Sequence, residues 1–218
     1  NDKLLSKELS KELEELETIA LLIVKDGKIE NEQYWDNYSA QSLSNSFSMA
    51  KSIVGILIGI AIDEGKIKNI DESIGNYLPH FSEGDKSKIT IKHLLTMSSG
   101  LNWDESYSSP FSMTTEGYYG SDLPSLMNKL EPKREPGTLW RYKSGDSQLL
   151  GLILAKATGV SLSEYASDKL WKPLGAENDA LWSLDEKGGV EKAYCCFNSN
   201  ARDFARFGQL ILQNGKWN

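Results

Sequence analysis

The stretch that decides the fold is Phe47 to Glu64, which reads FSMAKSIVGILIGIAIDE and is the most apolar segment of the chain. Its aliphatic residues lie on every side of a helical wheel, which is typical of a helix buried in a protein core. The segment is longer than most strands, so it predicts a helix even though β-branched residues are frequent in it. Gly65 follows as a C-terminal stop.

The chain before this segment predicts a surface helix and a β-hairpin. Residues 2–17 place leucines at helical spacing among charged residues, which indicates an amphipathic helix. Thr18 to Val24 and Ile29 to Trp35 are strand-like runs, and the Asp26-Gly27 pair between them is a hairpin signal. Two strands alone are marginally stable, so we expect further strands to complete the sheet.

The chain after the apolar segment predicts mainly helices. Thr90 is expected to cap one of them, and Ser161 with Glu164 forms a capping box at another. The stretch Leu101 to Leu123 is rich in Ser, Gly and aromatic residues and has no clear period, which favours a long functional or mobile loop. The expected helices span Asp71 to Leu78, Ile91 to Thr96, Ser147 to Ala157, Ser161 to Leu170 and Ala201 to Gln213.

Composition and motifs exclude several classes of protein. The 218 residues are 39% hydrophobic and 25% charged, which is ordinary for a globular chain. A net charge of −7 makes nucleic acids and anionic membrane surfaces poor partners. The longest apolar stretch, Ile53 to Ile62, is shorter than the roughly 20 residues that span a bilayer, so no membrane span is expected.

No P-loop, G-x-G-x-x-G or H-E-x-x-H motif occurs, and we expect no cofactor and no metal. His80 and His93 lack partners at metal or triad spacing, so both are expected to be structural.

The two cysteines of the chain, Cys195 and Cys196, are adjacent. The ring that a disulfide between neighbours would close is too small for relaxed disulfide geometry. We therefore expect both to be small packing residues rather than an ordinary disulfide.

The strongest chemical candidate is Ser48-Met49-Ala50-Lys51, an S-x-x-K arrangement. Ser48 stands where the buried helix begins, and free N–H groups and the positive dipole end there favour a developing alkoxide. Residues i and i+3 share a helix face, so the Lys51 amine can reach the hydroxyl. The hydrocarbon of the next turns would disfavour the charged amine and make it a general base. The alternative is that Ser48 only caps the helix and Lys51 extends to water.

The second candidate is Tyr142, in Tyr142-Lys143-Ser144 between Pro136-Gly137 and the next buried helix. A nearby ammonium favours the phenolate form, so this side chain could pass a proton to a leaving group. The alternative is a structural tyrosine whose hydroxyl is hydrogen-bonded.

Together these pieces resemble the serine β-lactamase and penicillin-binding-protein superfamily. The similarity is greatest to the branch of class C β-lactamases, esterases and 6-aminohexanoate-dimer hydrolases, and it covers roughly Thr18 to Asn218. The cysteine pair is similar to the nylon-oligomer hydrolases of that branch. The motifs that carry the resemblance are Ser48-Met49-Ala50-Lys51, Asp71 to Pro79, Thr90 to Leu101, Pro136-Gly137 before Tyr142, Leu149-Leu150-Gly151, Lys172 to Gly175 and Arg202 to Gly208.

The resemblance implies an α+β fold in which an antiparallel sheet is flanked by helices and joined to a mainly helical subdomain. We expect one domain over 1–218. Residues 1–40 would supply the N-terminal helix and the first strands, 41–195 the helical subdomain with the site, and 196–218 a helix returning to the sheet. The family's third motif, a Lys or His followed by a small residue and Gly on a late strand, is absent. We therefore expect a chain that lacks its C-terminal strands or is completed by a separate C-terminal fragment.

The resemblance also implies a serine hydrolase that forms an acyl-enzyme on Ser48, with Lys51 as base and Tyr142 as proton shuttle. The substrate would be a small molecule or peptide with an amide or ester bond, such as a β-lactam, D-alanyl peptide, carboxylic ester or linear amide. Ser144 stands where this branch usually has Asn, and it is expected to contact substrate. Trp103 is also expected to contact substrate. Its alternative role is to pack within the aromatic-rich stretch Leu101 to Leu123. The competing interpretation is a catalytically silent protein that binds a peptide or cell-wall fragment. The family favours an extracytoplasmic location, periplasmic or secreted, over a cytoplasmic one.

Overall fold

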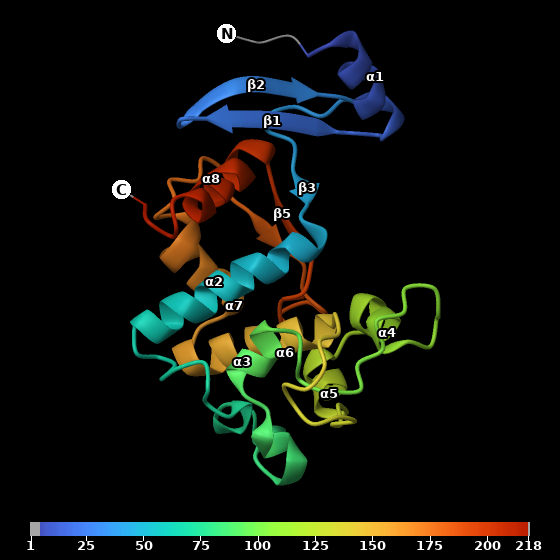
Figure 1. The fold of residues 1–218 in the computed structure, drawn as a ribbon, viewed down its shortest axis with the longest axis vertical. Helices are drawn as coiled ribbons and strands as arrows, with labels where there is room; N and C mark the ends of the chain where they lie inside the picture. The colour runs from blue at the N-terminus through green and yellow to red at the C-terminus, as the bar shows by residue number, and fades with distance from the viewer. Residues whose placement is uncertain (1–4, 218) are drawn as a thin grey trace. The chain divides into compact units, whose positions relative to one another are not determined.

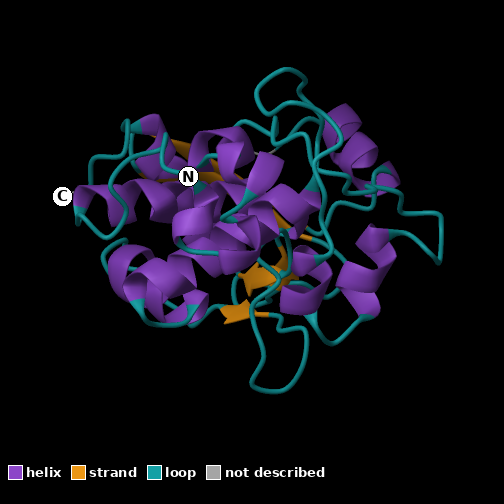
Figure 2. Ribbon diagram, turned by 90° about the horizontal axis from the view of Figure 1, so that it is seen from below, coloured by secondary structure: helices purple, strands orange, loops and turns teal. Residues whose placement is uncertain are grey.

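The computed structural model describes residues 5–217 and divides into two compact units. The first unit combines the described residues up to 45 with 171–181 and 198–217, and the second combines 46–170 with 182–197. Helices make up most of the ordered structure and strands a small part (Figure 2). Within residues 5–217, no helix is both long enough and apolar enough to cross a bilayer.

A β-hairpin forms one side of the first unit (Figure 1). Strand β1 (Ala20–Lys25) pairs antiparallel with β2 (Lys28–Tyr34). Asp26 and Gly27 both have positive φ, at 50° and 72°, as the tight turns preferred in hairpins require. The predicted hairpin is therefore confirmed.

Helix α1 (Lys7–Glu15) precedes the hairpin. It begins after Ser6, whose hydroxyl accepts a hydrogen bond from the Leu9 amide. The helix predicted over 2–17 is confirmed in its central part, and residues 2–4 of that prediction lie outside the described residues.

Helix α8 (Ala201–Leu212) packs against β1 in the first unit. The Nε and Nη2 atoms of Arg202 each donate to a carboxylate oxygen of Glu32 on β2, at 2.7 Å. These hydrogen bonds hold the pKa of Glu32 below its usual value. A two-pronged pair of this kind fixes orientation as well as distance, so it holds the helix in register with the hairpin.

A second, very small sheet is made of short strands. β3 (Ser44–Asn45) pairs antiparallel with β5 (Phe197–Ser199), with Ser44 opposite Ser199. β4 (Leu181–Trp182) is the third strand. None of these strands has a length that a period-two pattern could reveal in the sequence.

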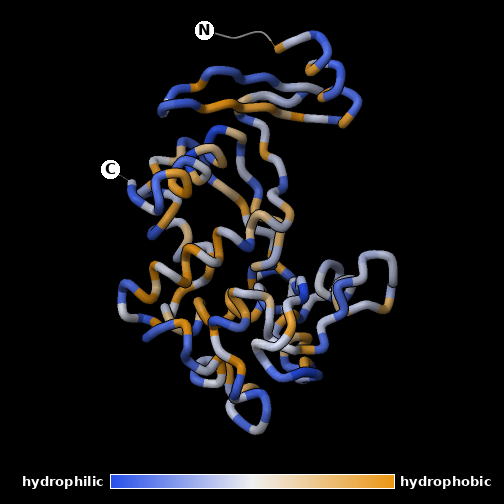
Figure 3. The backbone as a smooth tube through the Cα atoms, viewed as in Figure 1, coloured by the Kyte–Doolittle hydropathy of each residue, from blue (hydrophilic) through white to orange (hydrophobic). Residues whose placement is uncertain are grey.

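The core of the second unit forms around α2 (Ala50–Asp63), which packs against α6 (Ser144–Thr158). The predicted buried helix is confirmed, and α2 appears as a mainly apolar stretch in Figure 3. Burial is not uniform around α2, because Gly59 is exposed and Ile56 and Ile60 are partly exposed. Each fully buried large aliphatic side chain contributes about 1.5–3 kcal/mol to stability. The buried residues of α2 are Ala50, Ile53, Val54, Leu57, Ile58 and Ala61.

Shorter helices complete this unit. Thr90 and Ser161 cap their helices through capping boxes, as predicted. The stretch Leu101 to Leu123 was expected to be a loop, but it contains helix α4. The sequence did not reveal this helix, because it is short and only two of its residues are buried, so it has no apolar period. The elements are α3 (Ile91–Leu95), α4 (Met113–Tyr119), α5 (Leu123–Asn128), α7 (Leu162–Ala166), the 3₁₀ turns Phe47–Met49, Ile74–Asn76, Pro79–Phe81 and Gly84–Lys88, and the π-turn Ser167–Trp171.

Candidate functional site

The structure brings Ser48 and Lys51 together at the start of α2. Ser48 lies in the 3₁₀ turn Phe47–Met49, and Lys51 lies in the first turn of the helix that follows. The Nζ atom of Lys51 donates to the Oγ atom of Ser48 at 3.2 Å. The three-residue spacing therefore places amine and hydroxyl within reach of direct proton transfer.

The surroundings of the Lys51 amine differ from the expected hydrocarbon. Its Nζ atom donates to the carbonyl oxygen of Tyr194 at 2.8 Å. It also lies 4.9 Å from the ring centroid of Tyr142 and 5.9 Å from that of Tyr194. The aliphatic stripe of α2 packs into the core instead, and Lys51 is only partly buried. A carbonyl and two aromatic rings therefore hold the amine in place.

Tyr142 is held by the backbone on both sides of it. The Arg141 amide donates to the Met97 carbonyl oxygen at 2.9 Å, and the Lys143 amide donates to the Met97 sulfur at 3.4 Å. Met97 itself has a φ of 55°, an uncommon conformation for a side chain of this size. These contacts place the Tyr142 ring beside the Lys51 amine, so the three predicted residues meet at one point.

Ser144 is completely buried at the first position of α6. Its hydroxyl donates to Glu105 Oε1 at 2.6 Å, and its amide donates to Glu105 Oε2 at 2.5 Å. A carboxylate at a helix N-terminus satisfies a free N–H group and lies at the positive end of the helix dipole. The Ser144 hydroxyl is therefore engaged within the protein.

Trp103 forms part of a cavity wall and is 4% exposed. Its indole Nε1 donates to Glu105 Oε2 at 2.6 Å. The ring packs closely on Gly145, where an added Cβ would come within 2.6 Å of a ring carbon. The cavity has a volume of about 570 Å³ and is lined by Asn102, Trp103, Asp104, Glu105, Ser106, Arg141 and Tyr142.

Sequence reasoning missed two residues of this site, Glu105 and Tyr194. Glu105 accepts four hydrogen bonds, the fourth from the Tyr107 hydroxyl at 2.5 Å. Burial and this bond raise the pKa of Tyr107. No local pattern distinguishes this acid from its neighbours in the loop. Tyr194 acts through its backbone carbonyl, which leaves no mark in the sequence.

The structure overturns the expectation for the two cysteines, because Cys195 and Cys196 form a disulfide. Both residues are buried, as expected of packing residues. The small ring is incompatible with an ordinary backbone, but Cys196 has a φ of 66°, in the left-handed region. The Trp182 indole donates to the Cys195 carbonyl at 2.9 Å and so helps to hold this turn. The disulfide directly follows Tyr194, whose carbonyl binds the Lys51 amine.

A buried polar cluster lies at the start of α6, next to Tyr142. Ser99 Oγ donates to Asp146 Oδ1 at 2.6 Å, and Lys143 Nζ lies 3.5 Å from the same Ser99 oxygen. Burial raises the pKa of Asp146 to about 7 and lowers the pKa of Lys143. The Asp146 carboxyl therefore holds a proton in part of the molecules near pH 7.

His93 has a structural role, as predicted. Its Nδ1 accepts a hydrogen bond from the Thr90 amide at 3.2 Å, which completes the capping box of α3. Burial lowers the pKa of His93. Within residues 5–217, no group of three or more His, Cys, Asp or Glu side chains is placed to hold a metal ion.

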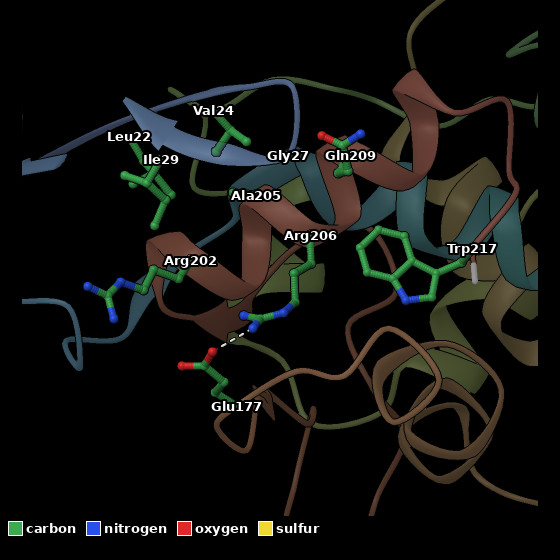
Figure 4. Close-up of a pocket in the computed structure, with 10 residues that line it drawn as sticks. All are labelled: Leu22, Val24, Gly27, Ile29, Glu177, Arg202, Ala205, Arg206, Gln209 and Trp217. Carbon is green, nitrogen blue, oxygen red and sulfur yellow. Dashed lines mark hydrogen bonds and ion pairs between the residues drawn. The ribbon is translucent and has the colours of Figure 1, made fainter. Parts of the chain in front are cut away.

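A separate cavity of about 290 Å³ lies in the first unit, between the hairpin and α8 (Figure 4). Leu22, Val24 and Ile29 line it from the hairpin. Arg206, on α8, pairs with Glu177 at 2.5 Å on the opposite side. It contains none of the predicted site residues.

This chain is similar in sequence and fold to several known proteins. The family model for Beta-lactamase matches residues 7–217. A 6-aminohexanoate-dimer hydrolase from Paenarthrobacter ureafaciens is 26% identical over an alignment of 219 positions that covers 95% of this chain and 55% of the relative. The solved structure of a candidate 6-aminohexanoate-dimer hydrolase from Bacillus anthracis is similar at a TM-score of 0.87 and 26% identity, covering 96% of this chain and 58% of that one. A penicillin-binding protein from Bacillus halodurans shares the fold, with a TM-score of 0.77 at 18% identity over 96% of this chain and 75% of that one.

The chain spans only a third to about half of the length of the curated relatives it matches, with shares from 33% to 55%.

Proposed function

Because the chain belongs to the beta-lactamase family, we propose that the protein is a serine hydrolase that cleaves an amide or ester bond through an acyl-enzyme on Ser48. The observation that carries this proposal is the 3.2 Å distance between Lys51 Nζ and Ser48 Oγ. A hydroxyl is a weak nucleophile until a neighbouring base removes its proton, and Lys51 is the base in reach.

The proposed reaction has two halves. Ser48 Oγ attacks the carbonyl carbon while its proton moves to Lys51 Nζ. The bond to the leaving nitrogen or oxygen then breaks, and the leaving group takes a proton through the Tyr142 phenol, whose ring lies 4.9 Å from the amine. Water then attacks the carbonyl carbon of the ester on Ser48, and the bond between that carbon and Ser48 Oγ breaks. The acyl group leaves as a carboxylic acid, and the proton taken from the water returns to Ser48 Oγ through the same groups.

Among amide and ester substrates, we favour a linear amide. The relative from Paenarthrobacter and the structure from Bacillus anthracis both have names that describe hydrolysis of a 6-aminohexanoate dimer, which contains such a bond. Ser144, at the position where an Asn is usual, donates its hydroxyl to Glu105. This engagement weakens the case for a polar contact from that side chain to a lactam.

Labelling with a fluorophosphonate probe tests the proposal. The probe should form one adduct on the wild-type protein and none on Ser48→Ala. Ser52→Ala is the matched control, because Ser52 is an exposed serine one turn further along α2, and its labelling should be unchanged. A folded wild-type protein that stays unlabelled but binds a peptide or cell-wall fragment would support a silent binding protein instead.

A further inference from the structure

The disulfide between Cys195 and Cys196 directly follows the residue that holds the Lys51 amine. The Tyr194 carbonyl oxygen accepts a hydrogen bond from Lys51 Nζ at 2.8 Å. This carbonyl belongs to the peptide unit whose nitrogen is the Cys195 amide, so it turns when the backbone of Cys195 turns. That amide donates to the Lys192 carbonyl oxygen at 3.0 Å. The position of the Lys51 amine is therefore tied to the turn that the disulfide closes.

The residue on the other side of the disulfide holds the chain just before Ser48. The Phe197 carbonyl oxygen accepts a hydrogen bond from the Ser46 amide at 2.8 Å. Ser46 directly precedes the 3₁₀ turn in which Ser48 lies. The Phe197 ring packs edge-on against Trp182, with the ring centroids 5.1 Å apart. The two residues that flank the disulfide thus contact the chain on both sides of the proposed nucleophile.

The backbone of Cys196 has a conformation that a free chain rarely keeps. Its φ is 66°, in the left-handed region, where a residue with a Cβ pays a cost in free energy. Such a residue stays in this region only when its surroundings hold it there. The covalent bond to the adjacent side chain is one such constraint. When this bond breaks, we expect Cys196 to move toward an ordinary negative φ, and the flanking carbonyls to move with it.

Other contacts of this segment do not involve the sulfur atoms. Gln148, on α6, accepts a hydrogen bond from the Ala193 amide at 2.9 Å and donates one to the Glu191 carbonyl oxygen at 3.0 Å. The Trp182 indole donates to the Cys195 carbonyl oxygen at 2.9 Å. These bonds keep the segment attached to its unit, so opening of the disulfide changes the turn without unfolding the protein.

A small dithiol can open this disulfide by thiol–disulfide exchange. Cys195 is completely buried and Cys196 is 8% exposed, so Cys196 is the member of the pair that solvent reaches. A thiolate of the reductant attacks the Cys196 sulfur, the S–S bond breaks, and Cys195 leaves as a thiolate that takes up a proton. The second thiolate of the reductant then displaces Cys196, which also takes up a proton. Two electrons and two protons pass to the protein, and the reductant becomes a disulfide.

We propose that Cys195 and Cys196 form a redox-modification site that controls the hydrolase. Reduction by a dithiol releases the Tyr194 carbonyl from the Lys51 amine and lowers turnover, and reoxidation restores both. The effect on turnover rests on the proposed function, in which Lys51 is the base for Ser48. A base that loses the contact fixing its position spends less time at the distance that proton transfer needs.

Kinetics of the oxidised and the reduced protein test the proposal. The protein is treated with dithiothreitol, the reagent is removed under nitrogen, and free thiols are counted. The count should rise from zero to two, because the 218 residues contain no other cysteine. The kcat for a p-nitrophenyl ester should fall about tenfold, with KM nearly unchanged, since positioning of the base rather than substrate binding is lost. Reoxidation with oxidised glutathione should restore kcat.

The variant Cys195→Ser/Cys196→Ser is the matched control. It should have the low kcat of the reduced protein and should not respond to the dithiol. If this variant does not fold, reduction and reoxidation of the wild type still decide the question. Two free thiols with an unchanged kcat would overturn the proposal. So would a disulfide that the dithiol opens in urea but leaves closed in the folded protein.

Hydrogen exchange separates failure of the redox site from failure of the proposed function, because it needs no substrate. The Ser46 amide, which donates to Phe197, should exchange about tenfold faster after reduction, as expected when local opening becomes easier. Amides in the middle of α6 should be unaffected. Faster exchange at Ser46 in a protein that cleaves no ester in either state supports the redox site and counts against the hydrolase. Equal exchange before and after complete reduction contradicts the redox site, whatever happens to activity.

Discussion

The amine of Lys51 donates a hydrogen bond to the backbone carbonyl of Tyr194 at 2.8 Å, across 143 positions of the chain. A flexible lysine side chain is thereby anchored at one point, with Ser48 Oγ 3.2 Å from the same nitrogen. A base held at a fixed distance from its nucleophile avoids the entropy cost of finding it.

Replacement of Lys51 by Ala should lower turnover of any substrate by at least about 100-fold, the scale of a lost general base. The helix around it should stay intact, because Lys51 is not one of the buried residues of α2. The measurement is kcat for a p-nitrophenyl ester, with a thermal melt to check folding. Lys66→Ala, at an exposed position after the same helix, is the control. Turnover near that of the wild type would remove Lys51 from the mechanism.

Replacement of Tyr142 by Phe keeps the ring beside the Lys51 amine and removes only the hydroxyl. We expect a loss of at least about 100-fold on an amide, because an amine leaves poorly without a proton. Measured as kcat/KM, which reports the acylation half alone, the loss should be much smaller on a p-nitrophenyl ester, whose leaving group needs no proton. Tyr119→Phe, at a position that is 88% exposed, should affect neither substrate. Equal losses of Tyr142→Phe on both substrates would argue against proton delivery to the leaving group.

Asp146 should make the protein less stable as pH rises. Burial raises its pKa to about 7, whereas the pKa of an aspartate in an unfolded chain is about 3.9. Between these values the folded state holds a proton that the unfolded state has released, so the free energy of unfolding falls with pH, at a limiting slope of about 1.4 kcal/mol per pH unit. Urea unfolding at several pH values between 4 and 8 should show this slope, and Asp146→Asn should remove it. A slope that persists in the variant would show that other groups cause it.

Gly145 should be required for the position of Trp103. An added methyl group would come within 2.6 Å of the indole, so Gly145→Ala should displace the ring, change its fluorescence and destabilise the protein by about 1–3 kcal/mol. Gly59→Ala is a matched control on α2, because an added Cβ there has open space, and it should be neutral or slightly stabilising. Similar effects of the two substitutions would mean that the ring does not depend on this contact.

Local patterns in the sequence predicted much of this structure. The Asp26-Gly27 turn follows from a pair of neighbours, and the meeting of Ser48 with Lys51 follows from one helical turn. Contacts between distant segments had no such signal. The contact of Glu105 with the first amide of α6 forms only when distant segments come together. The same is true of the contact between the Tyr194 carbonyl and the Lys51 amine.

The disulfide was missed for a different reason. The disulfide was excluded on the ground that neighbouring cysteines close too small a ring. That rule assumes ordinary backbone conformations, and it does not cover a turn with a left-handed residue such as Cys196. The short helix α4 was missed because tertiary packing, rather than a periodic pattern, determines it.

The central claim is that the Ser48 oxygen becomes covalently acylated. Its most direct test is mass spectrometry of protein that is acid-quenched during turnover of an ester, followed by peptide mapping. One acyl group is expected on the peptide that contains Ser48; it should accumulate before steady state and be absent in Ser48→Ala. Product formation at the wild-type rate with no acyl group on that peptide, or with the acyl group on another residue, would contradict it.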